Sequence, residues 1–130
     1  MIILTIDGLP LPYKAPYVSR KVCFNPRESE KKKHQWQLRA QWNKPIICKA
    51  LEVEYIYHFP VPKATSKVKA TQSLNGIIKH SKRPDLDNLD KYLSDCLQGV
   101  VIEDDSQIHR KTSSKVYGMA PKTIIMLFVD

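Results

Sequence analysis

Apolar and polar residues alternate most regularly in the middle of the chain. From Leu51 to Tyr57 every odd-numbered residue is apolar or aromatic, and Glu52 and Glu54 lie between them. A period of two is typical of a β-strand with one face against a core. Because prolines flank this stretch, we predict one long strand over Ile46–Phe59 and expect it to be the central strand of a sheet.

Three other segments are rich in β-branched and apolar residues. They run from Met1 to Asp7, from Gln107 to Tyr117 and from Lys122 to Val129. Gly118–Pro121 has the composition of a turn, so the last two segments are expected to form a terminal hairpin. Between Leu11 and Pro26 repeated prolines interrupt regular structure, which predicts a loop or a broken edge strand.

Two segments have a helical composition. Glu28–Trp42 contains residues that favour helix, with Ser29 as a candidate N-cap. Lys63–Leu74 is expected to form a short basic helix that Asn75-Gly76 ends. Together with the predicted strands, these helices indicate an α+β fold, a small mixed β-sheet with helices packed on it, in one domain that covers residues 1–130.

The clearest helical periodicity lies in Leu89–Leu97. Its apolar residues recur at i, i+3, i+4, i+7 and i+8, which is the stripe of an amphipathic helix facing a core. Asp87 is the candidate N-cap, with Asp90 three residues later in capping-box position, so the helix is expected to start at about Asn88. Gly99 is expected to end it.

Acidic residues gather around this helix in a chain that is otherwise basic. Asp85 and Asp87 are two residues apart on an extended approach, so they share a face, and Lys91 follows one helical turn after Asp87. The apolar run Val100–Ile102, a strand or a buried connection, leads to a second acidic turn that contains Asp105. If the run packs back beside the helix, this turn lies near the first.

These carboxylates suggest a metal site. Carboxylates within a few ångströms repel one another unless a cation intervenes, and a few carboxylate oxygens with room for water and phosphate suit Mg²⁺. The alternative is ordinary structure, in which Asp87 and Asp90 only cap a helix and Asp105 only makes a turn. A calcium loop is excluded because Asp90 stands where such a loop needs glycine.

Outside the acidic stretch the charge is strongly positive. Lys and Arg number 21 against 13 Asp and Glu, which gives a net charge of +8. Nucleic acid is the leading partner for such a surface, although charge alone does not separate enzymes from binding modules. The residues that we predict to contact DNA are Lys14, Arg20, Lys79, Lys82, Arg83, Arg110 and Lys111.

The cysteines and the apolar segments bear on the compartment. Cys23, Cys48 and Cys96 lack the spacing of metal ligands and are interpreted as reduced thiols. No signal peptide and no membrane-spanning run is recognisable, so a cytoplasmic protein without a membrane partner is expected. His80 is close enough to the acidic stretch in sequence to assist chemistry, but we favour the interpretation that it is a hydrogen-bonded structural histidine.

The motifs of the acidic stretch resemble a known family. Arg83–Lys91 matches the pattern P-D-x-D-N-x-x-K, Asp95–Gly99 matches an Asp-x-Leu-x-Gly helix end, and Asp104–Gln107 is a D-D-S-Q turn. Together they resemble the RusA-type Holliday junction resolvases, which phages and prophages often encode. The resemblance extends more weakly through Gly8–Pro10 and Val116–Gly118.

This resemblance implies a small α+β homodimer that uses Mg²⁺ or Mn²⁺ to nick two opposing strands of a four-way junction, a form of branched DNA. Residue by residue, it implies that Asp85, Asp87 and Asp105 bind the metal and that Lys91 is an essential lysine, with Asp104 adjacent. Two other classes stay open. They are a metal-dependent nuclease for other DNA, and a non-enzymatic nucleic-acid-binding module.

Overall fold

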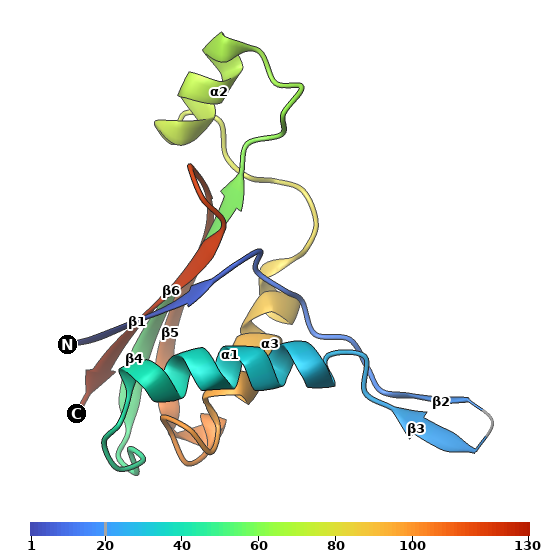
Figure 1. Cartoon of the computed structure of the whole chain (residues 1–130). Helices are drawn as coiled ribbons and strands as arrows, with labels where there is room; N and C mark the ends of the chain where they lie inside the picture. The colour runs from blue at the N-terminus through green and yellow to red at the C-terminus, as the bar shows by residue number, and fades with distance from the viewer. Residues whose placement is uncertain (20) are drawn as a thin grey trace.

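A four-stranded mixed sheet forms the centre of the protein, and the computed structural model describes residues 1–19 and 21–130. In spatial order its strands are β1 (Ile2–Asp7), β6 (Lys122–Val129), β4 (Leu51–Pro60) and β5 (Ile108–Gly118) (Figure 1). β6 is antiparallel to both β1 and β4, whereas β4 and β5 are parallel. The mixed sheet and its helices confirm the predicted α+β class.

β4 lies inside the sheet, as predicted, and pairs along its length with β5 on one edge and β6 on the other. Its odd-numbered side chains are buried and most of its even-numbered ones are half-buried, in agreement with the alternation. The strand starts at Leu51 rather than Ile46. The residues before it pair elsewhere, since Ile47 donates its N–H to the carbonyl of Val101 at 2.8 Å.

The predicted hairpin of the last two strands is wrong. β5 and β6 follow each other in the chain, but β4 lies between them. The turn at residues 119–121 therefore passes over the end of β4, where Pro60 lies opposite Gly118. The composition of a turn is local, whereas the strand that occupies the space between β5 and β6 comes from a distant part of the chain.

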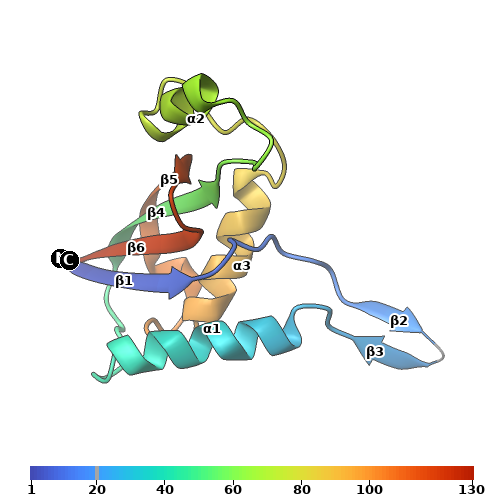
Figure 2. The ribbon, with the colours of Figure 1, turned by 45° about the horizontal axis from the view of Figure 1, so that its top comes forward.

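Two helices cover one face of the sheet, as Figures 1 and 2 show. They are α1 (Glu28–Gln41) and α3 (Leu86–Leu97). Leu38 of α1 and Leu89 of α3 are both fully buried in the core that the inward side chains of β4 also form. The core therefore fixes α3 against β4 and β5, which positions the acidic residues at its N-terminus.

The ends of the other helices differ slightly from prediction. The N-cap of α1 is Arg27, not Ser29, because Asn25 starts the turn by accepting the N–H of Arg27 at 3.1 Å. α2 (Lys67–Leu74) is shorter than predicted, since Ser66 caps its N-terminus.

In the described part of the chain, no helix has the length and apolar character needed to cross a membrane.

A short hairpin projects from the body beside the start of α1 (Figure 1). β2 (Tyr17–Ser19) and β3 (Val22–Phe24) pair only with each other. Of the two structures predicted for Leu11–Pro26, the edge strand is wrong, because this segment does not extend the main sheet, and residues 11–16 form a loop as predicted. Arg20, predicted to contact DNA, lies outside the described residues.

Candidate active site

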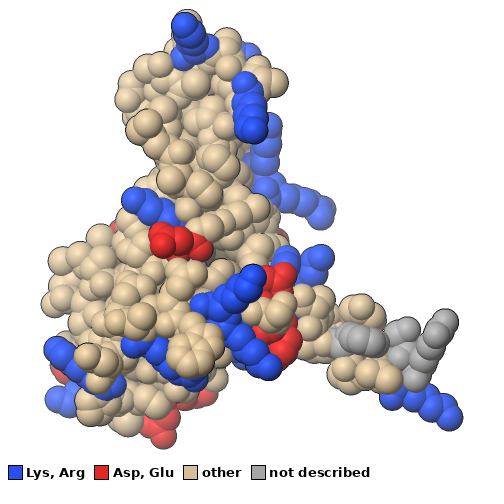
Figure 3. Space-filling model, viewed as in Figure 1, with Lys and Arg blue, Asp and Glu red and all other residues tan. Residues whose placement is uncertain are grey.

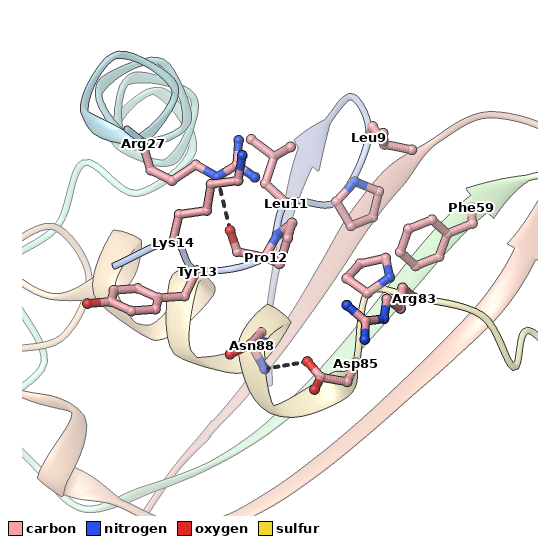
Figure 4. Close-up of a pocket in the computed structure, with 12 residues that line it drawn as sticks. Leu9, Leu11, Pro12, Tyr13, Lys14, Arg27, Phe59, Arg83, Asp85 and Asn88 are labelled. Carbon is pink, nitrogen blue, oxygen red and sulfur yellow. Dashed lines mark hydrogen bonds between the residues drawn. The ribbon is translucent and has the colours of Figure 1, made fainter. Parts of the chain in front are cut away.

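The N-terminus of α3 presents two acidic side chains. Asp85 is the N-cap, not Asp87 as predicted, because its backbone is extended and its Oδ1 accepts the N–H of Asn88 at 3.3 Å (Figure 4). The helix therefore begins at Leu86, two residues earlier than expected. Asp87 is exposed in the first turn, where the helix dipole stabilises a negative charge.

Asp90 is a buried carboxylate rather than the predicted capping residue. It is 4 % exposed. Its Oδ1 accepts the hydroxyl of Tyr57 at 2.6 Å, and its Oδ2 accepts the hydroxyl of Ser113 at 2.7 Å. The Nζ of Lys111 lies 3.2 Å from the same Oδ2. Because the helix starts earlier than predicted, the capping-box position falls on Asn88 and Asp90 faces the sheet.

Lys91 lies on the exposed side of α3, one turn after Asp87 and away from the buried Leu89, as predicted. Its Nζ lies 4.0 Å from the centroid of the Tyr13 ring, within the range of a cation–π interaction. Tyr13 is itself fixed to the helix, because its N–H donates to the carbonyl of Asn88 at 2.9 Å. The Lys91 ammonium is therefore held near the N-terminus of α3.

The second acidic turn contains one aspartate that caps and one that does not. Asp104 is the N-cap of a 3₁₀ turn at Asp105–Gln107, and its Oδ2 accepts the N–H of Ser106 at 3.1 Å. Gln107 completes a capping box by accepting the N–H of Asp104 at 2.7 Å. Hydrogen bonds from Ser106 lower the pKa of Asp104. Asp105 is exposed and its side chain takes no part in this cap, so both of its carboxylate oxygens are left for a ligand.

The run Val100–Ile102 is a buried connection, one of the two structures predicted for it, and the chain returns beside α3 after it. Asp105 lines a cavity of about 270 Å³ together with Ser94 of α3 and Lys111 of β5. Asp85 lines a different cavity of about 720 Å³, shown in Figure 4. Each of the two acidic turns therefore borders its own cavity on the α3 side of the sheet.

The three predicted metal ligands are not gathered at one point. Ser94, which shares a cavity with Asp105, is seven residues after Asp87, or about 10 Å along the helix axis. In residues 1–19 and 21–130, no three His, Cys, Asp or Glu side chains are grouped so that they could hold a metal ion. The donor type still fits a hard cation, because Asp85, Asp87 and Asp105 are all exposed carboxylates.

Basic side chains border both cavities. Figure 3 shows Lys and Arg atoms around the acidic atoms between α3 and the β2–β3 hairpin. The described residues predicted to contact DNA fall in three places. Lys14 and Arg83 line the Asp85 cavity, Arg110 and Lys111 line the Asp105 cavity, and Lys79 and Lys82 are exposed on the connection between α2 and α3.

A polar side of β5, which was not predicted, faces α3. Lys111, Ser113 and Lys115 lie opposite inward-pointing residues of β4. Lys115 Nζ donates to the carbonyls of Lys82 at 2.6 Å and Pro84 at 3.0 Å, which fixes the approach to α3. No periodic signal marks this side in the sequence, because every residue from His109 to Lys115 is polar. The inward-facing residues can be identified only once β5 is known to flank the helix.

His80 is held by ring contacts. Its ring stacks on Phe59 with centroids 4.3 Å apart, and it lies 5.1 Å from the ring of Tyr117. Burial, and then the charge of Lys115, lower the pKa of His80. Its Nδ1 is buried without a hydrogen-bond partner among the described residues. His80 is thus packed as a structural residue, although the expected hydrogen bond is not made by this nitrogen.

Comparison with known proteins gives two matches. A family model described as endodeoxyribonuclease RusA matches residues 8–128. A Bacillus subtilis (strain 168) protein, described as uncharacterized protein YqaN, is 29% identical to this chain over 131 residues, which covers 95% of this chain and 92% of that protein. The family match includes both acidic turns, all of β4 and β5 and all of β6 but its last residue, whereas β1 lies before it.

Proposed function

This chain belongs to the endodeoxyribonuclease RusA family, and on that basis we propose that it is a metal-dependent nuclease that resolves four-way DNA junctions by paired, symmetric nicks. The observation that carries the proposal is the exposed pair Asp85 and Asp87 at the N-terminus of α3, with Lys91 held beside it. A helix cap alone would need one of these carboxylates. The second carboxylate and the lysine are what phosphodiester hydrolysis would use.

Asp85 and Asp87 would hold Mg²⁺, for which Mn²⁺ is the expected substitute, and Asp105, which lines a separate cavity, would complete the ligand set when the two acidic turns close on the ion. The bound ion would supply an activated water molecule and neutralise charge that develops on the phosphate. Asp85 uses one carboxylate oxygen for the cap, which leaves its other oxygen as a donor. In the second turn Asp104 likewise uses one oxygen for its cap, whereas both carboxylate oxygens of Asp105 lie outside the cap, which supports Asp105 as the ligand from this turn.

Lys91 would stabilise the negative charge of the transition state or of the leaving oxygen. Its ammonium is exposed, yet it is oriented by the ring of Tyr13. A positive group that is fixed before the reaction costs little reorganisation when charge develops, which is why such groups contribute strongly to catalysis.

The basic side chains would provide most of the affinity for DNA. Carboxylates repel a phosphate backbone until a cation is bound, so binding must come from residues such as Lys14, Arg83 and Arg110 around the two cavities. Contacts of this kind release counterions, and the affinity for a junction is therefore expected to fall steeply as salt rises.

A homodimer would place two such sites symmetrically, as paired nicks require. The sheet face opposite α1 and α3 supports a contact with a second copy, because it carries apolar side chains. Ile3 and Phe128 on this face are 52% and 38% exposed, and Met126 between them is half-buried. A twofold contact through this face would bury them.

The experiment that tests the proposed function is incubation with a synthetic four-way junction, a flap, a single nick and a linear duplex, each with Mg²⁺ or with EDTA. We expect paired nicks in the junction that need the metal, and much slower cleavage of the duplex. Cleavage of the flap alone would favour the alternative nuclease. Binding without any cleavage would favour a non-enzymatic binding module.

A further inference from the structure

The carboxylate of Asp90 receives donors from two strands of the sheet. Tyr57 of β4 donates at 2.6 Å, Ser113 of β5 donates at 2.7 Å, and Lys111 Nζ lies at 3.2 Å. The side chain of Asp90 is 6% exposed, whereas 43% of the Lys111 side chain is exposed. The pair therefore joins a buried acid to an ammonium group that a ligand can reach.

Stability alone is a poor reason for this pair. Removing a carboxylate from water is costly, and apolar residues of similar size at such positions often stabilise a protein as well or better. Leu89 and Leu93 show that apolar side chains fill the neighbouring positions of α3 in the core. At position 90, where an apolar side chain could pack, the chain instead has a carboxylate whose polar contacts extend to Lys111.

The position of Lys111 suggests what the network does. Lys111 lines the same cavity as Asp105 and Ser94. Its long side chain is flexible, and without a fixed partner its ammonium would sample many positions in solvent. The contact with Asp90 Oδ2 keeps the ammonium on the α3 side of β5, which is the side on which the predicted metal ligand Asp105 lies.

We propose that Asp90 is a positioning residue that holds the Lys111 ammonium at the Asp105 cavity, where it contacts the phosphate that is cleaved. This inference rests on the proposed function, because it assigns a role at the same site. Tyr57 and Ser113 complete the arrangement by donating to the two oxygens of the same carboxylate. The phosphate-contacting group is Lys111, and Asp90 acts through it.

Two simpler roles for Asp90 give different results. If only its charge mattered, removing an acid from a DNA-binding surface would reduce repulsion and tighten junction binding without slowing cleavage. If Asp90 were only structural, its replacement would lower the melting temperature but leave the turnover of the folded protein unchanged. A positioning role alone predicts that its effect on turnover disappears when Lys111 is absent.

The test compares Asp90→Asn, Lys111→Ala and the double variant with the wild-type protein on a synthetic four-way junction with Mg²⁺. Asp90→Asn is nearly isosteric, and its amide oxygen still accepts from Tyr57. kcat is measured at saturating junction, the dissociation constant for the junction is measured in EDTA, and melting temperatures establish folding. Lys111→Arg keeps the positive charge, and Lys33→Ala removes an exposed lysine of α1 as a matched control.

We expect kcat to fall about tenfold in each single variant and also about tenfold in the double variant, because the two residues act as one unit. Asp90→Asn should bind the junction at least as tightly as wild type, and Lys33→Ala should keep kcat within about threefold of it. Lys111→Arg should retain more kcat than Lys111→Ala, because it keeps the positive charge. Wild-type kcat in Asp90→Asn, or a loss of about a hundredfold in the double variant, would overturn the inference and leave the proposed function intact. A wild-type protein that cleaves no DNA would overturn both.

Discussion

The ammonium of Lys91 lies 4.0 Å from the centroid of the Tyr13 ring. The same tyrosine donates its N–H to the carbonyl of Asn88 at 2.9 Å, so the segment after β1 is fixed to the first turns of α3. A side chain from an extended segment thus orients a lysine of the helix that carries Asp85 and Asp87. This relationship gives Lys91 a defined position in an exposed part of the protein.

Lys91→Ala is expected to lower junction cleavage by about 10²-fold or more, because a fixed positive group near the phosphate is lost. Lys91 is exposed, so the melting temperature should stay close to that of wild type. Single-turnover cleavage with excess protein checks the rate independently of binding. Unchanged turnover would reduce Lys91 to a residue of the helix surface.

The adjacent acids of the second turn are expected to separate stability from activity. Asp104→Ala removes the cap that accepts from Ser106 and should lower the melting temperature while cleavage continues. Asp105→Asn should keep the melting temperature and lose cleavage by about 10²-fold or more. Thermal unfolding and junction cleavage of both variants test this contrast. The reverse assignment, with activity lost only in Asp104→Ala, would move the metal ligand to Asp104.

Mild acid is expected to destabilise the protein. Burial is the main cause that lowers the pKa of His34, His58 and His80 below the ordinary value of 6.5. As the pH falls, these histidines bind protons in the unfolded chain before they do so in the folded chain. The stability that is fully present above the unfolded-state pKa is therefore lost as the pH falls through the folded-state pKa values. Melting temperatures between about pH 7 and pH 5 should decrease, and less so in His34→Gln. A flat profile would contradict the burial of these rings.

Gly118→Ala is expected to destabilise the fold by about 1–3 kcal/mol through overpacking. A Cβ at this position would lie 2.8 Å from Nδ1 and 3.2 Å from Cβ of His58, and the inner part of a side chain cannot move away easily. Denaturant unfolding measures the loss. The same substitution in a His58→Ala background is the control, where its cost should shrink. An equal cost in both backgrounds would show that His58 is not the obstacle.

Local patterns in the sequence correctly predicted those helices and strands that bury a single face. The structure confirms the period of two in β4 and the apolar stripe of α3, because each element buries one face in a single core. The predicted terminal hairpin is wrong because a turn between β5 and β6 indicates only that they are close in the chain, whereas β4 lies between them in the sheet. Propensity says little about which distant strand fills a gap.

The sequence predicts which residues belong to the candidate site, but not which of its aspartates caps the helix and which is buried. Asp85 and Asp87 were both identified, but the cap fell on Asp85 because the helix began two residues early. The sequence predicts that Asp90 is part of a cap, whereas in the structure it is buried and accepts a hydrogen bond from Tyr57. A carboxylate in a helical stripe has the same appearance in a sequence whether it faces solvent or a tyrosine on a distant strand. The partners of Asp90 could therefore be named only from the structure.

The most direct test of the central claim is cleavage of a synthetic four-way junction with Mg²⁺ by wild-type protein and by Asp85→Asn. Asparagine caps a helix as well as aspartate does, so this variant keeps the bond from Asn88 and removes only the charge. We expect paired nicks from the wild type, and from Asp85→Asn normal junction binding with cleavage reduced by about 10²-fold or more. Full nicking by folded Asp85→Asn would contradict the assignment of a metal-binding carboxylate at the N-terminus of α3.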